Sequence, residues 1–229
     1  MKKAGILFCS LFASLILTAQ QADSNYQFRK AIQKTRLFLP VALMGSGVLT
    51  NGNGAESLKK EIAEERDERL PGFHTAIDNY LQFSPIFIAY GLDALGYKSK
   101  TDLLNRTAIL LKGELAMTAS VFTLKSVTHQ LRPDKSGYNS FPSGHTAQAF
   151  AAATFLSEEY KGRFHWMPYA AYGLAGSVGV MRLVNNKHYI SDVLFGAGLG
   201  YLSMKMSYWT HQYKWNKHYK QQSPSTSIY

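Results

Sequence analysis

Six apolar segments of helical length constrain the fold of this chain more than any other feature. Glycine and proline gather between the segments rather than at the spacing of β-hairpins, and no long alternation of apolar and polar residues occurs. The sequence therefore predicts an all-α fold, a single helical bundle of about six helices. The segments are Leu37–Thr50, Ala76–Leu95, Leu103–Leu124, His145–Leu156, Trp166–Val184 and Tyr189–Trp209.

Hydropathy gives a mixed indication of whether this bundle lies in a membrane. Trp166–Met181 is uncharged and rich in small apolar residues, whereas Leu103–Leu124 carries Lys112 and Glu114 near its middle. A charge at the bilayer centre costs about 2.5–3.5 kcal/mol on insertion scales. The two charged side chains must therefore face a bundle interior or water. The mean hydropathy of −0.16 is also low for six spans.

The placement of basic residues favours a membrane protein. Basic clusters follow the second, fourth and sixth segments, so they share one side if the segments alternate across a bilayer. The positive-inside rule makes that side cytoplasmic and puts the other loops outside. Because the motif loops must then lie outside, Ala4–Ala19 and Leu37–Thr50 cannot both span: either the first is cleaved and Leu37–Thr50 packs or re-enters, or the first stays and Leu37–Thr50 lies flat. The clusters are Lys98 and Lys100, Lys161 and Arg163, and Lys214, Lys217 and Lys220.

Both ends of the chain differ from its centre. Met1-Lys2-Lys3 and the uncharged run that follows have the pattern of a secretory signal, with an uncleaved first helix as the alternative. We expect residues 1–20 to be that segment, residues 21–220 to form one domain, and the polar residues 221–229 to be disordered. Cys9 is the only cysteine, which excludes an internal disulfide and a thiol-based metal site.

The net charge of +10, from 25 basic and 15 acidic residues, indicates an anionic partner. Nucleic acid is not expected, because the chain has neither zinc-ligand spacing nor an RNA-binding aromatic motif. An anionic membrane surface and an anionic substrate remain.

A histidine and an aspartate four residues apart are the first chemical candidates. On a helix His188 and Asp192 share a face, so the carboxylate can reach one ring nitrogen and fix the tautomer. The other nitrogen can then attack phosphorus, although such pairs also occur in purely structural networks. Arg182, six residues earlier, offers a planar fork suited to phosphate oxygens.

The tetrapeptide Pro142-Ser143-Gly144-His145 predicts the start of a helix. Serine is a preferred N-cap, and the unpaired amides of a first turn favour a phosphate. Gly144 lets the backbone approach closely, and His145 stands where it can protonate a leaving oxygen. An ordinary capped helix is the alternative.

Two further cations, Lys125 and Arg132, flank a segment that ends at Pro133. Cations there can neutralise a transferring phosphoryl group. His129 lies between them and is interpreted as structural. The charged stretch Glu56–Leu70 is predicted to be a solvated or interfacial helix without a chemical role.

The patterns K-x6-RP, PSGH and R-x5-H-x3-D together resemble the signature of the type 2 phosphatidic acid phosphatase superfamily, across Lys125 to Asp192. The resemblance implies a phosphatase-like helical domain that needs no metal and no cofactor. It implies that His188 attacks phosphorus with support from Asp192, while His145 protonates the leaving group and later activates water. The implied phosphate-binding residues are Lys125, Arg132, Ser143, Gly144 and Arg182.

One position departs from the family pattern. Met181 stands where the family usually has a serine before the arginine, so one hydroxyl contact to phosphate is missing. The nucleophile, the acid and the cations are untouched, and we expect activity. A phosphate-lipid binding protein that has lost catalysis is the alternative.

The family includes integral membrane enzymes that act on lipid phosphates and soluble periplasmic acid phosphatases. The basic clusters favour the first kind, in a bacterial inner membrane with the active site facing the periplasm. The expected partner is then a phosphorylated lipid in the membrane, with lipid A ahead of undecaprenyl pyrophosphate and phosphatidylglycerophosphate. A soluble periplasmic acid phosphatase remains the alternative.

Overall fold

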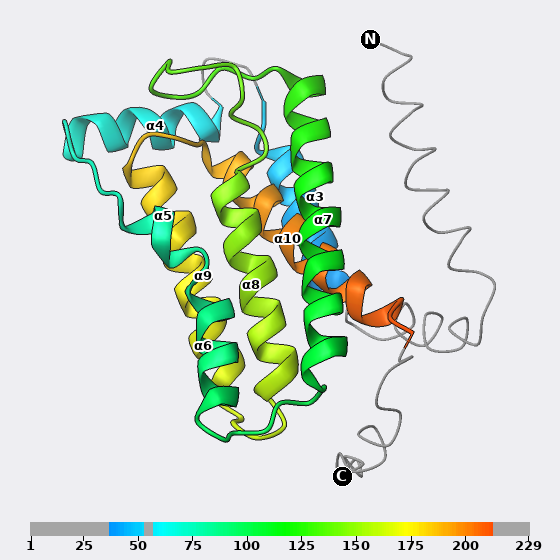
Figure 1. The fold of residues 1–229 in the computed structure, drawn as a ribbon. Helices are drawn as coiled ribbons and strands as arrows, with labels where there is room; N and C mark the ends of the chain where they lie inside the picture. The colour runs from blue at the N-terminus through cyan, green and yellow to red at the C-terminus, as the bar shows by residue number, and fades with distance from the viewer. Residues whose placement is uncertain (1–36, 53–56, 213–229) are drawn as a thin grey trace.

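The computed structural model describes residues 37–52 and 57–212. Within these ranges the chain forms eight helices and no strand (Figure 1), which confirms the predicted all-α fold. The predicted signal segment, residues 1–20, and the predicted tail, residues 221–229, lie outside the described residues. The helices are α3 (Phe38–Leu49), α4 (Leu58–Arg69), α5 (Ile77–Leu81), α6 (Ser84–Ala94), α7 (Leu103–Thr128), α8 (Gly144–Tyr160), α9 (Met167–Val184) and α10 (Ile190–Trp209).

Two of these helices go beyond the six apolar segments. The segment Ala76–Leu95 divides into α5 and α6, and Pro85 stands in the first turn of α6. Proline fits a first turn because its missing N–H would have no partner there, but it cannot continue a preceding helix. The charged stretch Glu56–Leu70 contains the other additional helix, α4.

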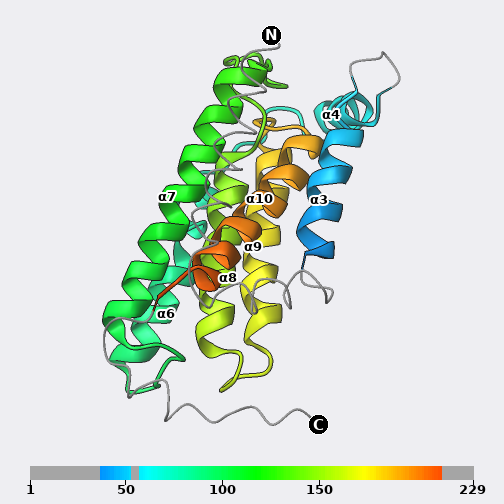
Figure 2. The same ribbon diagram turned by 90° about the vertical axis from the view of Figure 1, so that its right-hand side faces the viewer.

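Helix α8 forms the centre of the bundle, with α6, α7, α9 and α10 packed around it (Figures 1 and 2). Its residues are buried almost without exception from Thr146 to Tyr160. Small side chains such as those of Ala149 and Ala153 let neighbouring helices approach closely, and Phe155 and Leu156 fill the wider spaces.

Helix α10 crosses α8 obliquely and at backbone contact (Figure 2). A Cβ atom on Gly196 would lie 2.6 Å from the carbonyl oxygen of Ser143, and one on Gly200 would lie 2.0 Å from that of Ala147. The two glycines are one turn apart, so they present the same face to α8. This crossing brings the first turns of α8 and α10 together.

Helix α7 combines a buried polar contact with an exposed apolar face. Gln148 of α8 donates a hydrogen bond of 2.9 Å to Glu114, so this mid-helix carboxylate faces the bundle interior as the sequence required. On the outside, Leu111, Leu115 and Phe122 are more than half exposed. Among the described residues α7 is the one helix long and apolar enough to cross a membrane by length and composition.

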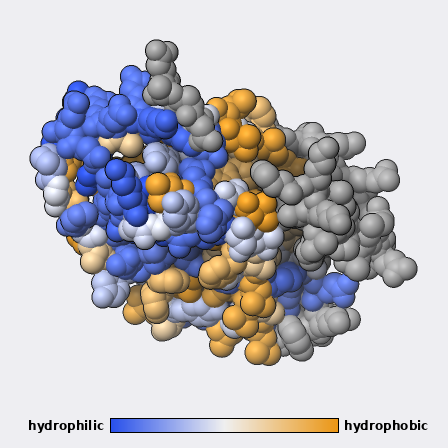
Figure 3. All heavy atoms as spheres, turned by 90° about the horizontal axis from the view of Figure 1, so that it is seen from above, coloured by the Kyte–Doolittle hydropathy of each residue, from blue (hydrophilic) through white to orange (hydrophobic). Residues whose placement is uncertain are grey.

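The two ends of the bundle differ in polarity. Helix α4 lies across one end (Figure 1), and that end presents a largely hydrophilic surface with hydrophobic residues gathered to one side (Figure 3). The connections α6–α7 and α8–α9 lie together at the opposite end. They carry Lys98, Lys100, Lys161 and Arg163, so two of the three predicted basic clusters share one end of the bundle. The third cluster lies outside the described residues.

Candidate active site

The three motifs converge at the end of the bundle that α4 covers. Ser143 is the N-cap of α8 and His145 lies in its first turn, while Arg182 lies in the last turn of α9. His188 lies in the short connection to α10, and Asp192 lies in the first turn of that helix. The Ser143 N–H donates to the Asp192 carbonyl at 3.0 Å, which joins the second motif to the third.

His188 and Asp192 are buried side by side, as their spacing predicts. Their side chains are 1% and 0% exposed, and His188 Nδ1 lies 3.4 Å from Asp192 Oδ2. That separation is long for a hydrogen bond, and Nδ1 has no hydrogen-bond partner within the described part of the chain. Burial lowers the pKa of His188 to about 4, although the Asp192 carboxylate opposes this effect. The imidazole is therefore neutral at neutral pH, and its Nε2 side is the one turned away from Asp192.

Asp192 is held by four donors. Its Oδ2 accepts from the Ser140 hydroxyl at 2.5 Å and from the Tyr189 N–H at 3.0 Å. Its Oδ1 accepts from the Ser191 hydroxyl at 3.2 Å and from the Gln130 amide at 3.4 Å. Sequence reasoning missed Ser140 and Gln130, because neither stands at a motif position and no spacing links them to Asp192.

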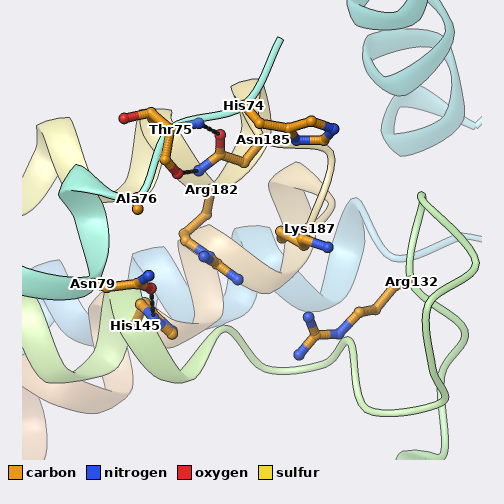
Figure 4. Close-up of a pocket in the computed structure, with 9 residues that line it drawn as sticks. All are labelled: His74, Thr75, Ala76, Asn79, Arg132, His145, Arg182, Asn185 and Lys187. Carbon is orange, nitrogen blue, oxygen red and sulfur yellow. Dashed lines mark hydrogen bonds between the residues drawn. The ribbon is translucent and has the colours of Figure 1, made fainter. Parts of the chain in front are cut away.

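A cavity of about 520 Å³ opens at the same end of the bundle (Figure 4), although neither His188 nor Asp192 lines it. Arg132, His145 and Arg182 come from the predicted set and lie around the same space. The remaining lining comes from residues that the motifs do not include. The residues that line it are His74, Thr75, Ala76, Asn79, Arg132, His145, Arg182, Asn185 and Lys187.

Arg182 and His145 both contact residues from the start of α5. Arg182 Nη1 lies 2.6 Å from Oδ2 of Asp78, a fully buried carboxylate, and His145 Nε2 lies 2.9 Å from Oδ1 of Asn79. Sequence reasoning missed both partners, since Asp78 falls within an apolar segment. A carboxylate in an apolar segment is the available signal, because buried carboxylates are almost always paired, and this segment holds two, Asp78 and Asp93.

The other cations of the cavity differ in their partners. Lys187 donates to Asp134 at 2.6 Å. Burial alone would raise the pKa of Asp134, but hydrogen bonds from Lys187 and Ser136 outweigh it and lower the pKa to about 2. Arg132 Nε donates to the Asn139 side-chain oxygen at 2.7 Å, and Lys125 Nζ donates to the Asn139 carbonyl.

The balance of charge follows from these contacts. The carboxylates of Asp78 and Asp134 pair with Arg182 and Lys187, whereas the described partners of Lys125 and Arg132 are neutral oxygens. Among the described residues Lys125 and Arg132 make no direct ion pair, although the Asp192 carboxylate lies near enough to attract both, so the site keeps a positive balance that favours an anion.

His129 and Gly144 lie at the boundaries of α7 and α8, and no protein contact requires glycine at position 144 among the described residues. His129 ends α7 with a left-handed backbone, φ 44°, and stacks on Tyr138 with ring centroids 5.1 Å apart. Gly144 begins α8, where a Cβ would meet only Val121 and Lys125 at ordinary contact distances. Within residues 37–52 and 57–212 no group of three His, Cys, Asp or Glu side chains is arranged to hold a metal ion.

These features define a helical protein with a buried histidine–aspartate pair and, at the same end of the bundle, a cavity of about 520 Å³ lined by Arg132, Arg182 and Lys187. Residues 118–216 match the PAP2 superfamily, and this segment contains every motif residue from Lys125 to Asp192. The resemblance to the type 2 phosphatidic acid phosphatase superfamily is confirmed over that part of the chain.

Among curated proteins, the chain is similar to the lipid A 1-phosphatase of Porphyromonas gingivalis. The two are 39% identical over 149 residues, which is 65% of this chain and 34% of the relative. The chain therefore spans about a third of the length of that protein.

Two solved structures are also similar. Aquifex aeolicus LpxE aligns with a TM-score of 0.48 and 22% identity, over 63% of this chain and 93% of LpxE. A transmembrane PAP2-type phosphatidylglycerolphosphate phosphatase from Bacillus subtilis aligns with a TM-score of 0.46 and 18% identity, over 75% and 94%.

Proposed function

We propose that this protein is a metal-independent lipid phosphatase that works through a phosphohistidine. The observation that carries the proposal is His188, buried and neutral against Asp192 at the end of the bundle where Arg132, Arg182 and Lys187 line a cavity. A neutral imidazole has a lone pair to offer, and the cations stabilise the charge on the phosphoryl oxygens.

The first half-reaction transfers the phosphoryl group to the protein. His188 Nε2 attacks phosphorus, the N–P bond forms, and the P–O bond to the lipid breaks. Burial and the nearby Arg182 lower the pKa of His145 to about 4 in the free protein. His145 is therefore expected to take up its proton with the phosphate monoester, whose negative charge favours the imidazolium, and to give that proton to the leaving oxygen. Asp192 stabilises the positive charge that develops on the His188 ring, because its carboxylate faces Nδ1 at 3.4 Å.

The second half-reaction restores the protein. His145, now without its proton, accepts one from a water molecule as that water attacks phosphorus. The N–P bond breaks, inorganic phosphate leaves, and His188 is neutral again. Lys125, Arg132 and Arg182 hold the phosphoryl oxygens in both steps, together with Ser143 and the Gly144 amide at the start of α8.

The proposed substrate is a phosphate monoester of an envelope lipid, with lipid A first. The similarity to the lipid A 1-phosphatase of Porphyromonas gingivalis supports lipid A. Phosphatidylglycerophosphate, another monoester, is the second candidate.

The proposed location is the inner membrane with the cavity toward the periplasm. The exposed apolar face of α7 supports membrane insertion. The basic residues of the α6–α7 and α8–α9 connections lie at the end opposite the cavity, which supports this orientation. Carbonate extraction of membranes tests the location, since a soluble periplasmic phosphatase would wash off.

The activity test measures phosphate release in detergent from lipid A, phosphatidylglycerophosphate and undecaprenyl pyrophosphate, with a chelator present. His188→Ala is expected to abolish release, and a matched control, His165→Ala, changes an exposed histidine at the far end. Full activity of His188→Ala would refute the mechanism. Mass spectrometry of envelope lipids with and without the gene then identifies the physiological substrate.

A further inference from the structure

The segment from Thr75 to Asn79 forms one wall of the cavity, although it lies outside the residues that match the family. Asp78 and Asn79 are adjacent in sequence yet reach different motifs. Asp78 meets Arg182 of the third motif, and Asn79 meets His145 of the second. Neighbouring positions on a helical turn point about 100° apart, which allows one short turn to serve both contacts.

The contact of Asp78 fixes one side of the Arg182 guanidinium. Nη1 lies 2.6 Å from Asp78 Oδ2 in a pair that is almost completely buried, and Nε has no hydrogen-bond partner among the residues that the structure describes. A hydrogen bond to a phosphate oxygen must therefore come from guanidinium nitrogens other than Nη1. Because a planar fork binds well only when its plane is oriented, the carboxylate decides which edge of Arg182 faces the phosphate.

The contact of Asn79 concerns the proton of His145. With the Asn79 side-chain oxygen 2.9 Å from Nε2, this nitrogen carries a hydrogen and donates it. Both side chains line the cavity (Figure 4), so Asn79 fixes the hydrogen on Nε2 and leaves Nδ1 as the ring nitrogen that can exchange a proton with the leaving oxygen.

The turn is itself locked against the end of α9. The Asn185 side-chain amide donates to Asp78 Oδ1 at 3.2 Å and to the Thr75 carbonyl at 2.9 Å. Its oxygen accepts from the Thr75 N–H at 2.8 Å. With every polar atom of the Asn185 side chain engaged, the turn cannot shift without breaking several bonds at once.

We propose that Asp78 and Asn79 are positioning residues, Asp78 for the phosphate-binding edge of Arg182 and Asn79 for the proton on His145. The inference rests on the proposed phosphatase function and adds to it a pair of groups from a different part of the chain. Neither residue forms a bond to the reacting phosphorus.

The experiment compares Asp78→Asn, Asn79→Ala and Asn79→Asp in the full chain in detergent. Its readouts are kcat, KM, the pH profile and thermal stability. Asp93→Asn is the matched control, because Asp93 pairs with the buried Arg106 at 2.9 Å on the side of the bundle away from the cavity. That control is expected to lower thermal stability and leave kcat and the pH profile unchanged.

Asp78→Asn is expected to lower kcat at least about tenfold with a much smaller change in KM, since Arg182 keeps its charge but not its orientation. In an Arg182→Ala background the same substitution is expected to have no further effect. A tenfold loss that persists in that background would overturn the role of Asp78.

Asn79→Asp is expected to move the alkaline limb of the pH profile upward, because a carboxylate holds the His145 proton more tightly than an amide does. Asn79→Ala is expected to move it downward. An unmoved limb in both variants would overturn the role of Asn79, and this readout stands even if Asp78→Asn fails to fold. An inactive wild type would instead overturn the proposed function, which separates the two failures.

Discussion

Replacing Gly196 by alanine tests whether the crossing of α10 and α8 sets the geometry of the site. Gly196 lies one turn after Asp192, and its added Cβ would lie 2.6 Å from the carbonyl oxygen of Ser143, two residues before His145. Ordinary contact begins at 3.4 Å, so the two backbones must separate by about 0.8 Å. No rotamer change can relieve the overlap, because both atoms belong to backbone or to Cβ.

The expected loss of activity exceeds the expected loss of stability. Overpacking costs about 1–3 kcal/mol, and alanine returns up to about 1 kcal/mol through its helix propensity. The net loss of unfolding free energy is thus at most about 2 kcal/mol. A displacement near 1 Å between reacting groups can lower a rate by about 100-fold, and the shift falls between His145 and the His188–Asp192 pair.

Two matched glycines make the assay specific. Gly173→Ala on α9 adds a Cβ with nothing within 4 Å, so it should leave both kcat and thermal stability intact. Gly198→Ala on α10 meets the Pro40 carbonyl of α3 at 2.7 Å, so it should lower stability without a comparable loss of kcat. If Gly196→Ala keeps kcat within twofold of wild type, or if Gly198→Ala loses as much, the crossing does not set the site.

Three further outcomes follow from contacts in and around the site. Ser140→Ala removes the 2.5 Å bond to Asp192 and is expected to lower stability by about 1–3 kcal/mol and kcat by about tenfold; unchanged kinetics would show that the other donors suffice. Burial gives His188 a pKa of about 4 in the folded chain, against 6.5 in the unfolded chain. Between these two values the unfolded chain binds one proton more than the folded chain, so the free energy of unfolding falls by about 3 kcal/mol as the pH drops from 6.5 to 4. Thermal melts against pH should show this slope in wild type and a shallower one in His188→Asn, and equal slopes would exclude His188 as the cause. Arg66→Ala removes a 2.8 Å bond from α4 to the Val184 carbonyl and should lower kcat several-fold, whereas Arg69→Ala, on the exposed side of α4, should not.

The sequence predicted the all-α fold and the convergence of the three motifs, because both depend on local patterns. Helical periodicity marks the segments, and the spacing from His188 to Asp192 places the pair across a single turn. The break between α5 and α6 was missed, although Pro85 marks it, because the apolar run continues across the proline.

The partners of the motif residues could not be predicted in the same way. Asp78 and Arg182 are 104 residues apart, and only the packing of α5 against α9 brings them together. Arg66 of α4 is a similar case: the charge pattern of Glu56–Leu70 predicts a solvated helix without chemistry, and most of its side chains are exposed. One arginine on its inner face nevertheless anchors the connection that carries His188.

The wall contributed by α5 has a consequence for how the chain acquires activity as it folds. Helices α7 to α10 carry all three motifs and follow one another directly in the chain, so their contacts close over short loops. The ion pair between Asp78 and Arg182 closes a loop of 104 residues, and contacts of such separation form late in folding. Recovery of phosphatase activity should therefore lag behind recovery of helix content, and activity should appear only when α5 packs against the assembled bundle.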